Sequence, residues 1–362
     1  MKKKYILLTI SSILIVGLVA IIINRNSKEY IMQDGVMLAL TLDGEKIDSY
    51  PNGTNYHVEV NCKNGNGKWL VDKWKLAVEE VTGNVLCNID FASNPTLLKT
   101  EVEEKATTIA NGYRYSGKRP NNYVWFNNEM WRIIGSIPVC LSASCGTNTT
   151  NLVKIIRNQS IGGLIYHATE SSYNGSWGGN TLYTLLNSYY LGKQDATDTS
   201  YCYGYGYSTR TNCNFSSIGI DTNGYYGNML KNVYWNAGKS DMSQTAGNYY
   251  SSEIATRTAS GYVGLMNASD YGYAADSSYH NTSTMYYNTA DITGSNWMYQ
   301  SEEWTMTQYN YQGSLFGIQR GGNVFYGYMQ TAISTRPVVY LDSSVYIISG
   351  DGTEANPYQI GM

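Results

Sequence analysis

The chain has 362 residues, which is enough for two domains of ordinary size with accessory segments. Charged residues make up only 15% of it, against about 25% in a typical soluble domain, and the formal net charge is −3. Nucleic-acid binding needs clustered basic residues, so this charge balance argues against nucleic acid as a partner. A hydrophobic content of 43% with 13% aromatic residues likewise argues against intrinsic disorder.

An apolar segment near the N-terminus predicts where in the cell the protein lies. Residues 5–24 carry no charge and are rich in Ile, Leu and Val. A helix of this length, at about 1.5 Å per residue, crosses a hydrocarbon core of about 30 Å. The lysines at positions 2–4 favour a cytoplasmic N-terminus. We expect residues 1–28 to form a cytoplasmic tip and a retained single-pass anchor in the plasma membrane, with the remainder outside. The alternative is a cleaved signal peptide, whose apolar region is shorter, roughly 7–15 residues.

Six cysteines lie beyond this segment and fall into sequence-local pairs. An even number of cysteines outside the cell is typical of disulfides. Zinc is the alternative, but the chain has no CxxC pair and its three histidines are scattered. We therefore predict no metal, no cofactor and three disulfides: Cys62–Cys87, Cys140–Cys145 and Cys202–Cys213.

Residues 30–92 are predicted to form a small β module. An apolar run from Val36 to Leu42 leads into an Asp-Gly turn. The segments Tyr56 to Cys62 and Val85 to Phe91 alternate between apolar and polar residues, as half-buried strands do. Cys62 near the end of one strand and Cys87 in the later one, with Trp69 and Trp74 between them, indicate a disulfide-pinned sandwich similar to immunoglobulin-like modules.

A linker helix and a polar connector are predicted over residues 93–121. Asn94-Pro95 has the residue types of an N-cap and a first helical position, and Gly112 those of a helix end. The apolar stripe of this helix is expected at Leu98, Val102 and Ile109.

The remaining residues, 122–362, predict a larger tyrosine-rich domain with strands and some helix. Asn180 is expected to cap a helix, since Leu182, Leu185, Leu186 and Tyr189 follow it at helical spacing. Strands are expected throughout the rest of the domain, including 304–306, 315–319 and 324–329. The fold class expected for the whole chain is mainly β with some α.

Several segments of the large domain carry a family resemblance. They are Tyr123 to Gly135 (YVWFNNEMWRIIG), the helix near Leu182, Val263 to Tyr271 (VGLMNASDY) and Arg336 to Leu341 (RPVVYL). Together they resemble uncharacterised, membrane-anchored bacterial surface proteins with a C-terminal C-type-lectin-like domain, in the branch that includes formylglycine-generating-enzyme-like folds. The resemblance implies a bacterial plasma membrane and a C-type-lectin-like distal domain. The calcium-binding EPN and QPD tripeptides of lectins are not in the sequence.

Tyrosine is the most unusual component of the composition, with 35 copies against 5 Phe. Tyrosine mixed with Gly, Ser and Asn is typical of evolved binding loops, because its ring offers contact area at a small entropy cost. The alternative is that these tyrosines fill the core; for the paired tyrosines we favour exposure. The ligand-binding candidates are Tyr203, Tyr205, Tyr225, Tyr226, Tyr249, Tyr250, Tyr286, Tyr287, Tyr309 and Tyr311.

Catalysis is not favoured by the sequence. His167 with Glu170 and His280 with Asp276 could form acid/base pairs, but neither pair lies near a nucleophile motif. Adjacent Glu302 and Glu303 on a strand point to opposite faces. The sequence therefore predicts a non-catalytic surface recognition or adhesion protein whose ligand is a glycan or a protein. A structural cell-envelope or pilus-like scaffold and an extracellular enzyme acting on a surface polysaccharide are the alternatives.

Overall fold

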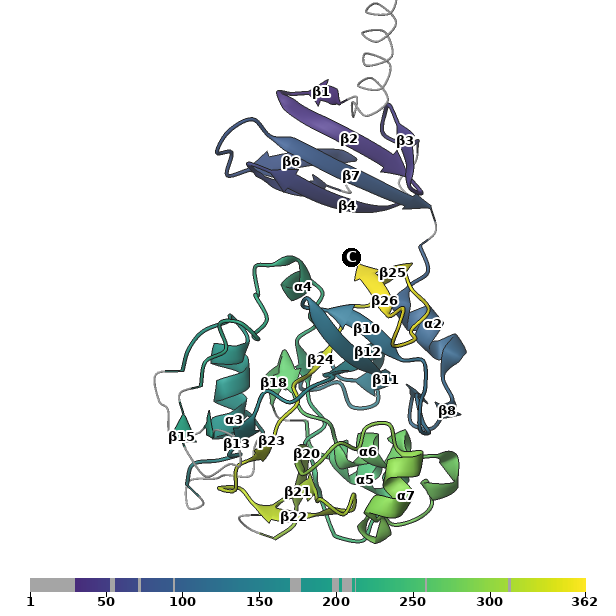
Figure 1. The fold of residues 1–362 in the computed structure, drawn as a ribbon, viewed down its shortest axis with the longest axis vertical. Helices are drawn as coiled ribbons and strands as arrows, with labels where there is room; N and C mark the ends of the chain where they lie inside the picture. The colour runs from purple at the N-terminus through teal and green to yellow at the C-terminus, as the bar shows by residue number, and fades with distance from the viewer. Residues whose placement is uncertain are drawn as a thin grey trace, which may run out of the picture. The chain divides into compact units, whose positions relative to one another are not determined.

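The computed structural model describes residues 30–362 except 53–55, 71–72, 94, 170–176, 197–201, 204–209, 212, 258 and 312–313. The predicted anchor, residues 5–24, lies outside the described residues. Among the residues that are described, no helix has the length and apolarity needed to cross a membrane. The chain divides into two compact units, Met1–Pro95 and Thr96–Met362, and strands predominate in both (Figure 1).

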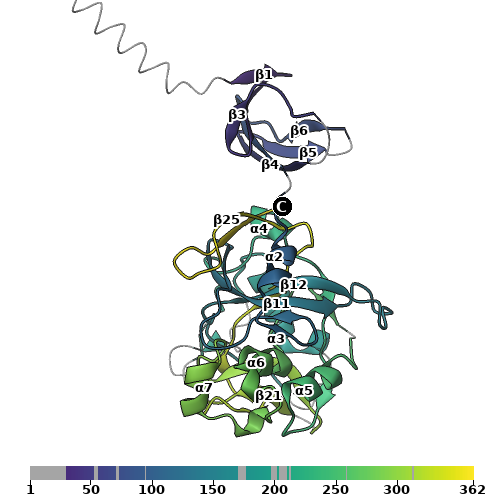
Figure 2. The same cartoon turned by 90° about the vertical axis from the view of Figure 1, so that its right-hand side faces the viewer.

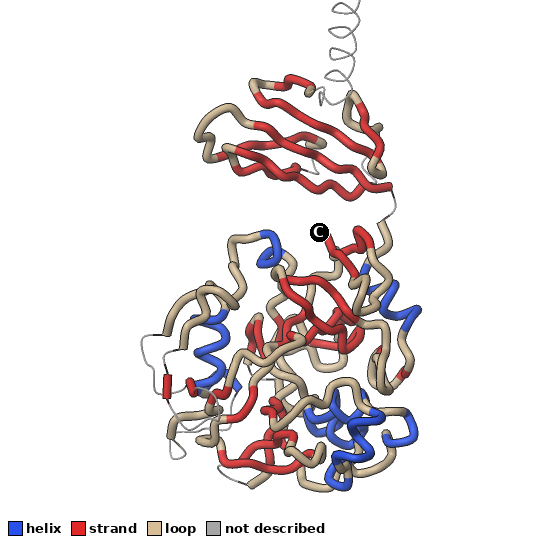
Figure 3. Tube along the Cα trace, in the orientation of Figure 1, coloured by secondary structure: helices blue, strands red, loops and turns tan. Residues whose placement is uncertain are grey.

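The first unit is built only of strands and loops in its described part (Figure 3). One sheet has the order β1-β2-β7-β4, and β3 also pairs with β2, further along the strand than β1 does. A separate hairpin joins β5 and β6. The strands are β1 (Ile31–Gln33), β2 (Val36–Leu42), β3 (Glu45–Ile47), β4 (Tyr56–Lys63), β5 (Asn66–Leu70), β6 (Lys75–Glu79) and β7 (Leu86–Ser93).

The core of the first unit lies between this sheet and the β5–β6 hairpin. Leu40 and Ile89 from the sheet are buried with Trp69 from the hairpin. The Trp69 ring meets the Phe91 ring edge to face, with centroids 5.3 Å apart. Cys62 and Cys87 are direct neighbours in the β4–β7 ladder. The disulfide therefore joins two strands of one sheet, and does not connect the two layers of a sandwich as the sequence suggested.

The helix expected as a linker belongs to the second unit. It is α2 (Leu98–Lys105), and both Leu98 and Val102 are buried in the core of that unit. It starts and stops elsewhere than predicted: Leu97 is the N-cap, and Gly112 lies beyond the helix in the turn between β8 (Thr108–Ile109) and β9 (Tyr113–Arg114). Gly112 adopts a φ of 117° there, a backbone conformation that side chains disfavour. Ile109, expected on the apolar stripe, is exposed.

Two larger sheets form the framework of the second unit. The first has the order β19-β24-β12-β11-β10-β26-β25, with β9 on β11 and β8 on β9. Its remaining strands are β10 (Tyr123–Phe126), β11 (Glu129–Val139), β12 (Thr150–Arg157), β19 (Val263–Gly264), β24 (Val338–Tyr340), β25 (Tyr346–Ser349) and β26 (Tyr358–Gly361). Buried residues of β11 and β12, such as Trp131 and Ile155, form the centre of the core.

The second sheet has the order β15-β14-β13-β23-β20-β21-β22, with β17 paired to β20. Its strands are β13 (Gly163–Leu164), β14 (Cys202–Tyr203), β15 (Arg210–Thr211), β17 (Lys239–Ser240), β20 (Glu303–Tyr309), β21 (Ser314–Ile318), β22 (Val324–Tyr328) and β23 (Ile333–Ser334). A two-stranded sheet pairs β16 (Val233–Tyr234) with β18 (Ser260–Gly261). The strand β22 lies at one edge of this sheet, and β15 lies at the other.

Helices of the second unit are short. Asn180 caps the helix predicted there: its Oδ1 accepts a hydrogen bond of 2.7 Å from the Tyr183 backbone N–H. In Figure 2 the group α5, α6 and α7 lies beside β21. The helices are η2 (Trp177–Gly179), α3 (Thr181–Thr184), η3 (Leu185–Tyr190), α4 (Tyr225–Asn228), α5 (Ala246–Glu253), α6 (Ala268–Ala274), η6 (Ser277–Tyr279), η7 (Thr284–Tyr286) and α7 (Thr289–Ser295).

Candidate functional site

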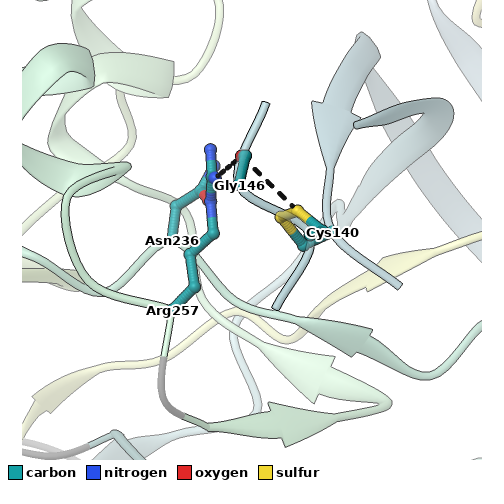
Figure 4. The surroundings of a disulfide bond; sticks show 5 residues. Cys140, Gly146, Asn236 and Arg257 are labelled. Carbon is teal, nitrogen blue, oxygen red and sulfur yellow. Dashed lines mark hydrogen bonds between the residues drawn. A yellow bond between two sulfur atoms is a disulfide. The ribbon is translucent and has the colours of Figure 1, made fainter. Parts of the chain in front are cut away.

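All three predicted disulfides are present, which confirms that prediction. The Cys140–Cys145 bridge closes a loop beside Arg257 (Figure 4). Arg257 donates from Nη1 to the Gly146 carbonyl at 2.9 Å and from Nε to Asn236 Oδ1 at 2.8 Å. The loop is thereby tied to a residue 111 positions further along the chain.

Three of the predicted ligand-binding tyrosines lie in the interior, so their expected exposure is wrong. Tyr249, Tyr250 and Tyr287 are 0%, 8% and 3% exposed. Their surroundings were expected to be loops, but Tyr249 and Tyr250 belong to α5, which packs against α6 and β17. The Tyr249 ring meets Phe316 at 5.3 Å, and burial raises the pKa of its hydroxyl to about 12. These three side chains support the fold and are not available to a ligand.

The other tyrosine candidates are divided between several places. Tyr286 is 69% exposed in η7, which lies against β22. Tyr225 is exposed and donates a hydrogen bond to the Ile360 carbonyl, while half-buried Tyr226 packs on Phe126. Tyr205 and the side chain of Tyr203 lie outside the described residues.

Tyr309 and Tyr311 do come together with tyrosines of β22 to form what we call the tyrosine surface: Tyr309, Tyr311, Tyr326 and Tyr328. The Tyr309 ring is stacked on the Tyr326 ring, with centroids 5.3 Å apart, and lies 6.4 Å from the Tyr311 ring. Tyr311 and Tyr328 are 71% and 66% exposed, whereas Tyr309 and Tyr326 are half-buried. The surface therefore combines two stacked, half-buried rings with two exposed ones, of which Tyr311 lies against Tyr309.

Strand pairing explains why these residues converge. In the β21–β22 hairpin Ser314 is opposite Tyr328, and its backbone N–H donates to the Tyr311 carbonyl at 3.3 Å. Tyr326 is opposite Phe316, whose ring also meets Tyr309 at 5.3 Å. Alternate residues of a strand share a face, so Tyr326 and Tyr328 point the same way. The sequence identified Tyr309 and Tyr311 but not their partners. The available signal was three aromatic residues among four, in Phe325-Tyr326-Gly327-Tyr328.

A hollow of about 170 Å³ adjoins the tyrosine surface. Gly317 and Gly327 are directly above the buried Trp304 indole: a Cβ on Gly327 would lie 3.5 Å from Trp304 Cη2. Their missing side chains leave the space open, and Tyr326 belongs to both the hollow and the tyrosine surface. Its lining includes Glu302, Trp304, Gln319, Phe325, Tyr326 and Gly327.

The adjacent carboxylates Glu302 and Glu303 have different surroundings. Glu303 is buried and accepts hydrogen bonds of 2.7 Å from both Nε and Nη2 of Arg336. Glu302 lies at the rim of the hollow, with its side chain 35% exposed and paired to the exposed Arg320 at 3.3 Å. The two carboxylates therefore do not act on one bond, in agreement with the strand geometry expected from the sequence.

A buried charged network, which sequence reasoning missed, lies under α6. Asp270 accepts hydrogen bonds from Arg114 Nη1 at 2.8 Å and Lys154 Nζ at 2.5 Å, and all three are at most 2% exposed. Although burial opposes ionisation, Lys154 and Arg114 hold the pKa of Asp270 below its usual value. The available signal was Lys154 itself, a charge inside an apolar strand. Such closed ion pairs order the fold and do not reach a substrate.

Glu253 is a second buried acid close to this network. Burial raises its pKa to about 7, although Ser269 and Thr307 oppose the shift by hydrogen bonding to the carboxylate. Ser269 donates from its backbone N–H at 3.0 Å, and Thr307 donates from its hydroxyl at 2.5 Å. The group is 1% exposed, so it has no route to a ligand at the surface.

The histidines considered for catalysis make structural hydrogen bonds. His167 Nδ1 accepts from the Thr181 backbone N–H at 3.1 Å, and burial lowers the pKa of the ring. His280 Nε2 lies 3.1 and 3.0 Å from the Tyr273 and Ala275 carbonyls. Glu170, the suggested partner of His167, is outside the described residues.

A larger hollow, of about 400 Å³, lies on the first unit. Its walls include Ala39 and Leu40 together with the charged residues Lys46, Glu59 and Asp90. Glu59 and Asp90 are opposite each other in the β4–β7 ladder, and Asp90 accepts a hydrogen bond from Thr41. It has no aromatic wall and mixes both signs of charge, so we take the hollow beside the tyrosine surface as the candidate site.

No protein-family profile, curated protein or solved structure matches this chain.

Proposed function

We propose that this protein is a membrane-anchored recognition protein of the bacterial cell surface, which binds a glycan or protein ligand without catalysis. The observation that carries the proposal is the tyrosine surface, where Tyr309 and Tyr326 are stacked, Tyr311 lies against Tyr309, and the rings of Tyr311 and Tyr328 are exposed. Interfaces concentrate their binding energy in such aromatic side chains. Ordering before binding lowers the entropy lost when the ligand arrives.

The proposed location is supported by the apolar run at residues 5–24 and by the three disulfides. Disulfides persist in oxidising surroundings and are rare in the cytosol. Residues 5–24 would hold the chain in the membrane as a single span, with the residues that follow it outside.

We also propose that the first unit is a divergent immunoglobulin-like module and the second a C-type-lectin-like domain. The two layers of the first unit are compatible with this, although its disulfide lies within one sheet. In the second unit, the resembling segments form β10, β11, β19 and β24, four strands of the same sheet.

The test is binding of the full chain, in a detergent without sugar groups, to arrays of glycans and of cell-surface proteins. Tyr311→Ala and Tyr328→Ala should each weaken binding by about 2 kcal/mol if they are hot spots. Tyr262→Ala is the matched control, since Tyr262 is also exposed but lies between β18 and β19. Binding that is equally strong in all three variants, or no ligand on either array, would count against the proposal.

A further inference from the structure

We propose that the hollow beside the tyrosine surface binds one uncharged pyranose ring, and that the next sugar of the same glycan lies on the tyrosine surface. This inference rests on the proposed function and names the ligand class. Sites for drug-sized ligands usually enclose about 300–1,000 Å³. The 170 Å³ of this hollow is suited to a single ring at the end or the edge of a larger molecule.

The walls of the hollow combine apolar and polar groups, which match the C–H face and the hydroxyl-bearing edge of a sugar ring. Phe325 and Tyr326 are half-buried, and their centroids are 4.5 Å apart. Since these two rings stack on each other and Tyr326 also stacks on Tyr309, it is the part of Phe325 lining the hollow that offers an apolar contact for the C–H face of a pyranose. Glu302, Gln319 and Thr331 are also in the lining and supply hydrogen-bonding groups for hydroxyls at the ring edge. Glu302 and Gln319 already accept hydrogen bonds from Arg320 and Asn323, and their remaining acceptor and donor positions are matched by sugar hydroxyls but not by an aliphatic or aromatic ligand.

Charge argues for an uncharged sugar. Glu302 is the one formally charged residue in the lining, and lysine and arginine do not occur in it. An acidic sugar would place its carboxylate beside Glu302 without compensation. A cationic ligand would have to compete with Arg320, which already pairs with Glu302.

Tyr326 connects the hollow to the rest of the surface. It lines the hollow, and its ring also stacks on Tyr309. A second sugar joined to the first therefore meets the Tyr309–Tyr311 side of the tyrosine surface. We expect an oligosaccharide to bind more tightly than its terminal monosaccharide.

The experiment screens the full chain against an array of neutral and acidic glycans, followed by titration with the best neutral oligosaccharide and its terminal monosaccharide. Gly327→Val fills the hollow; the Cβ makes ordinary contacts with Trp304, and valine favours strands. Affinity for both sugars should fall by more than about tenfold, since the new side chain occupies the ligand's place. Gly294→Val, where a Cβ meets nothing within 4 Å, is the control and should leave affinity unchanged.

Two further variants keep the test valid if Gly327→Val does not fold. Glu302→Ala should weaken binding by about tenfold through the loss of a hydrogen bond to a charged group. Arg320→Ala breaks the same ion pair but leaves the carboxylate, so it should bind normally. Tyr311→Ala should reduce affinity for the oligosaccharide while leaving that for the monosaccharide unchanged.

The outcomes separate this inference from the proposed function. Binding of a protein ligand that depends on Tyr311, with no glycan bound, would overturn the inference and leave the proposed function in place. Preference for acidic glycans, or glycan binding that Gly327→Val and Glu302→Ala do not affect, would also overturn it. Glycan binding that both variants weaken, with normal binding by both controls, would support it.

Discussion

The ring of Tyr326 is stacked on the ring of Tyr309, with centroids 5.3 Å apart and planes inclined by 21°. The two residues lie on β22 and β20, with β21 between them, and both rings lie near Phe316 of β21. Stacking across a strand fixes both rings before any ligand is present. The tyrosines of the second unit thus include a surface set and a buried set, with different expected mutational effects.

The first prediction separates these two sets by stability. Tyr249→Ala removes a fully buried ring, so we expect it to lower the free energy of unfolding by about 3–5 kcal/mol. Tyr286→Ala removes an exposed ring and should change it by less than about 0.5 kcal/mol. Urea denaturation of the two variants measures the difference. Similar values for both would show that burial does not distinguish them.

The second prediction concerns the buried ion network. Asp270→Asn leaves Arg114 and Lys154 buried without their carboxylate, so the free energy of unfolding should fall by about 3–5 kcal/mol. Asp342→Asn is the control, because its partner Lys231 is 39% exposed and such pairs contribute at most about 1 kcal/mol. Chemical denaturation at pH 7 compares the two. Equal losses would contradict the assignment of Asp270 as a sealed structural group.

The third prediction is a pH dependence that originates at Glu253. Its pKa is raised by burial from an ordinary 4.5 to about 7 in the folded chain. Between these values the folded chain retains a proton that the unfolded chain has lost, so stability falls as pH rises. Glu253→Gln stays uncharged and should lack this contribution.

Unfolding free energies of wild type and Glu253→Gln, measured from pH 4 to pH 8, test the prediction. The wild type should lose stability relative to the variant as pH rises towards about 7, and the difference should then level off. Curves that remain parallel over the whole range would be incompatible with a raised pKa at Glu253. Titrations elsewhere cancel in the comparison, because both proteins share them.

The fourth prediction ranks two disulfides by the loops they close. The pairs Cys140–Cys145 and Cys202–Cys213 are separated by 5 and 11 residues. In the chain-entropy model their replacement by serine pairs should lower the unfolding free energy by about 2 and 2.7 kcal/mol, respectively. Thermal and urea unfolding of the two double variants measures the order. A larger loss at 140 and 145 would indicate that the contacts of Gly146 with Arg257 contribute more than loop closure.

Local features of the sequence determined several parts of the structure. The cysteine pairs are close in sequence, so their pairing needed no knowledge of the fold. Asn180 caps its helix because the cap depends only on the next three residues. The alternating pattern of Tyr56 to Cys62 gave a strand for the same reason, since alternation depends only on neighbours along the chain.

Tertiary structure alone decided which tyrosines are buried and where the candidate site lies. Tyr249 and Tyr286 both belong to Tyr pairs in similar surroundings, and only the packing of α5 and η7 distinguishes them. The hollow joins Glu302, Phe325 and Gly327, which strand pairing brings together from separate segments. Arg114 and Asp270 are 156 residues apart, and no local pattern predicts that they meet. Contacts between distant segments depend on the whole core, whereas caps, turns and short disulfide loops depend on a few neighbouring residues.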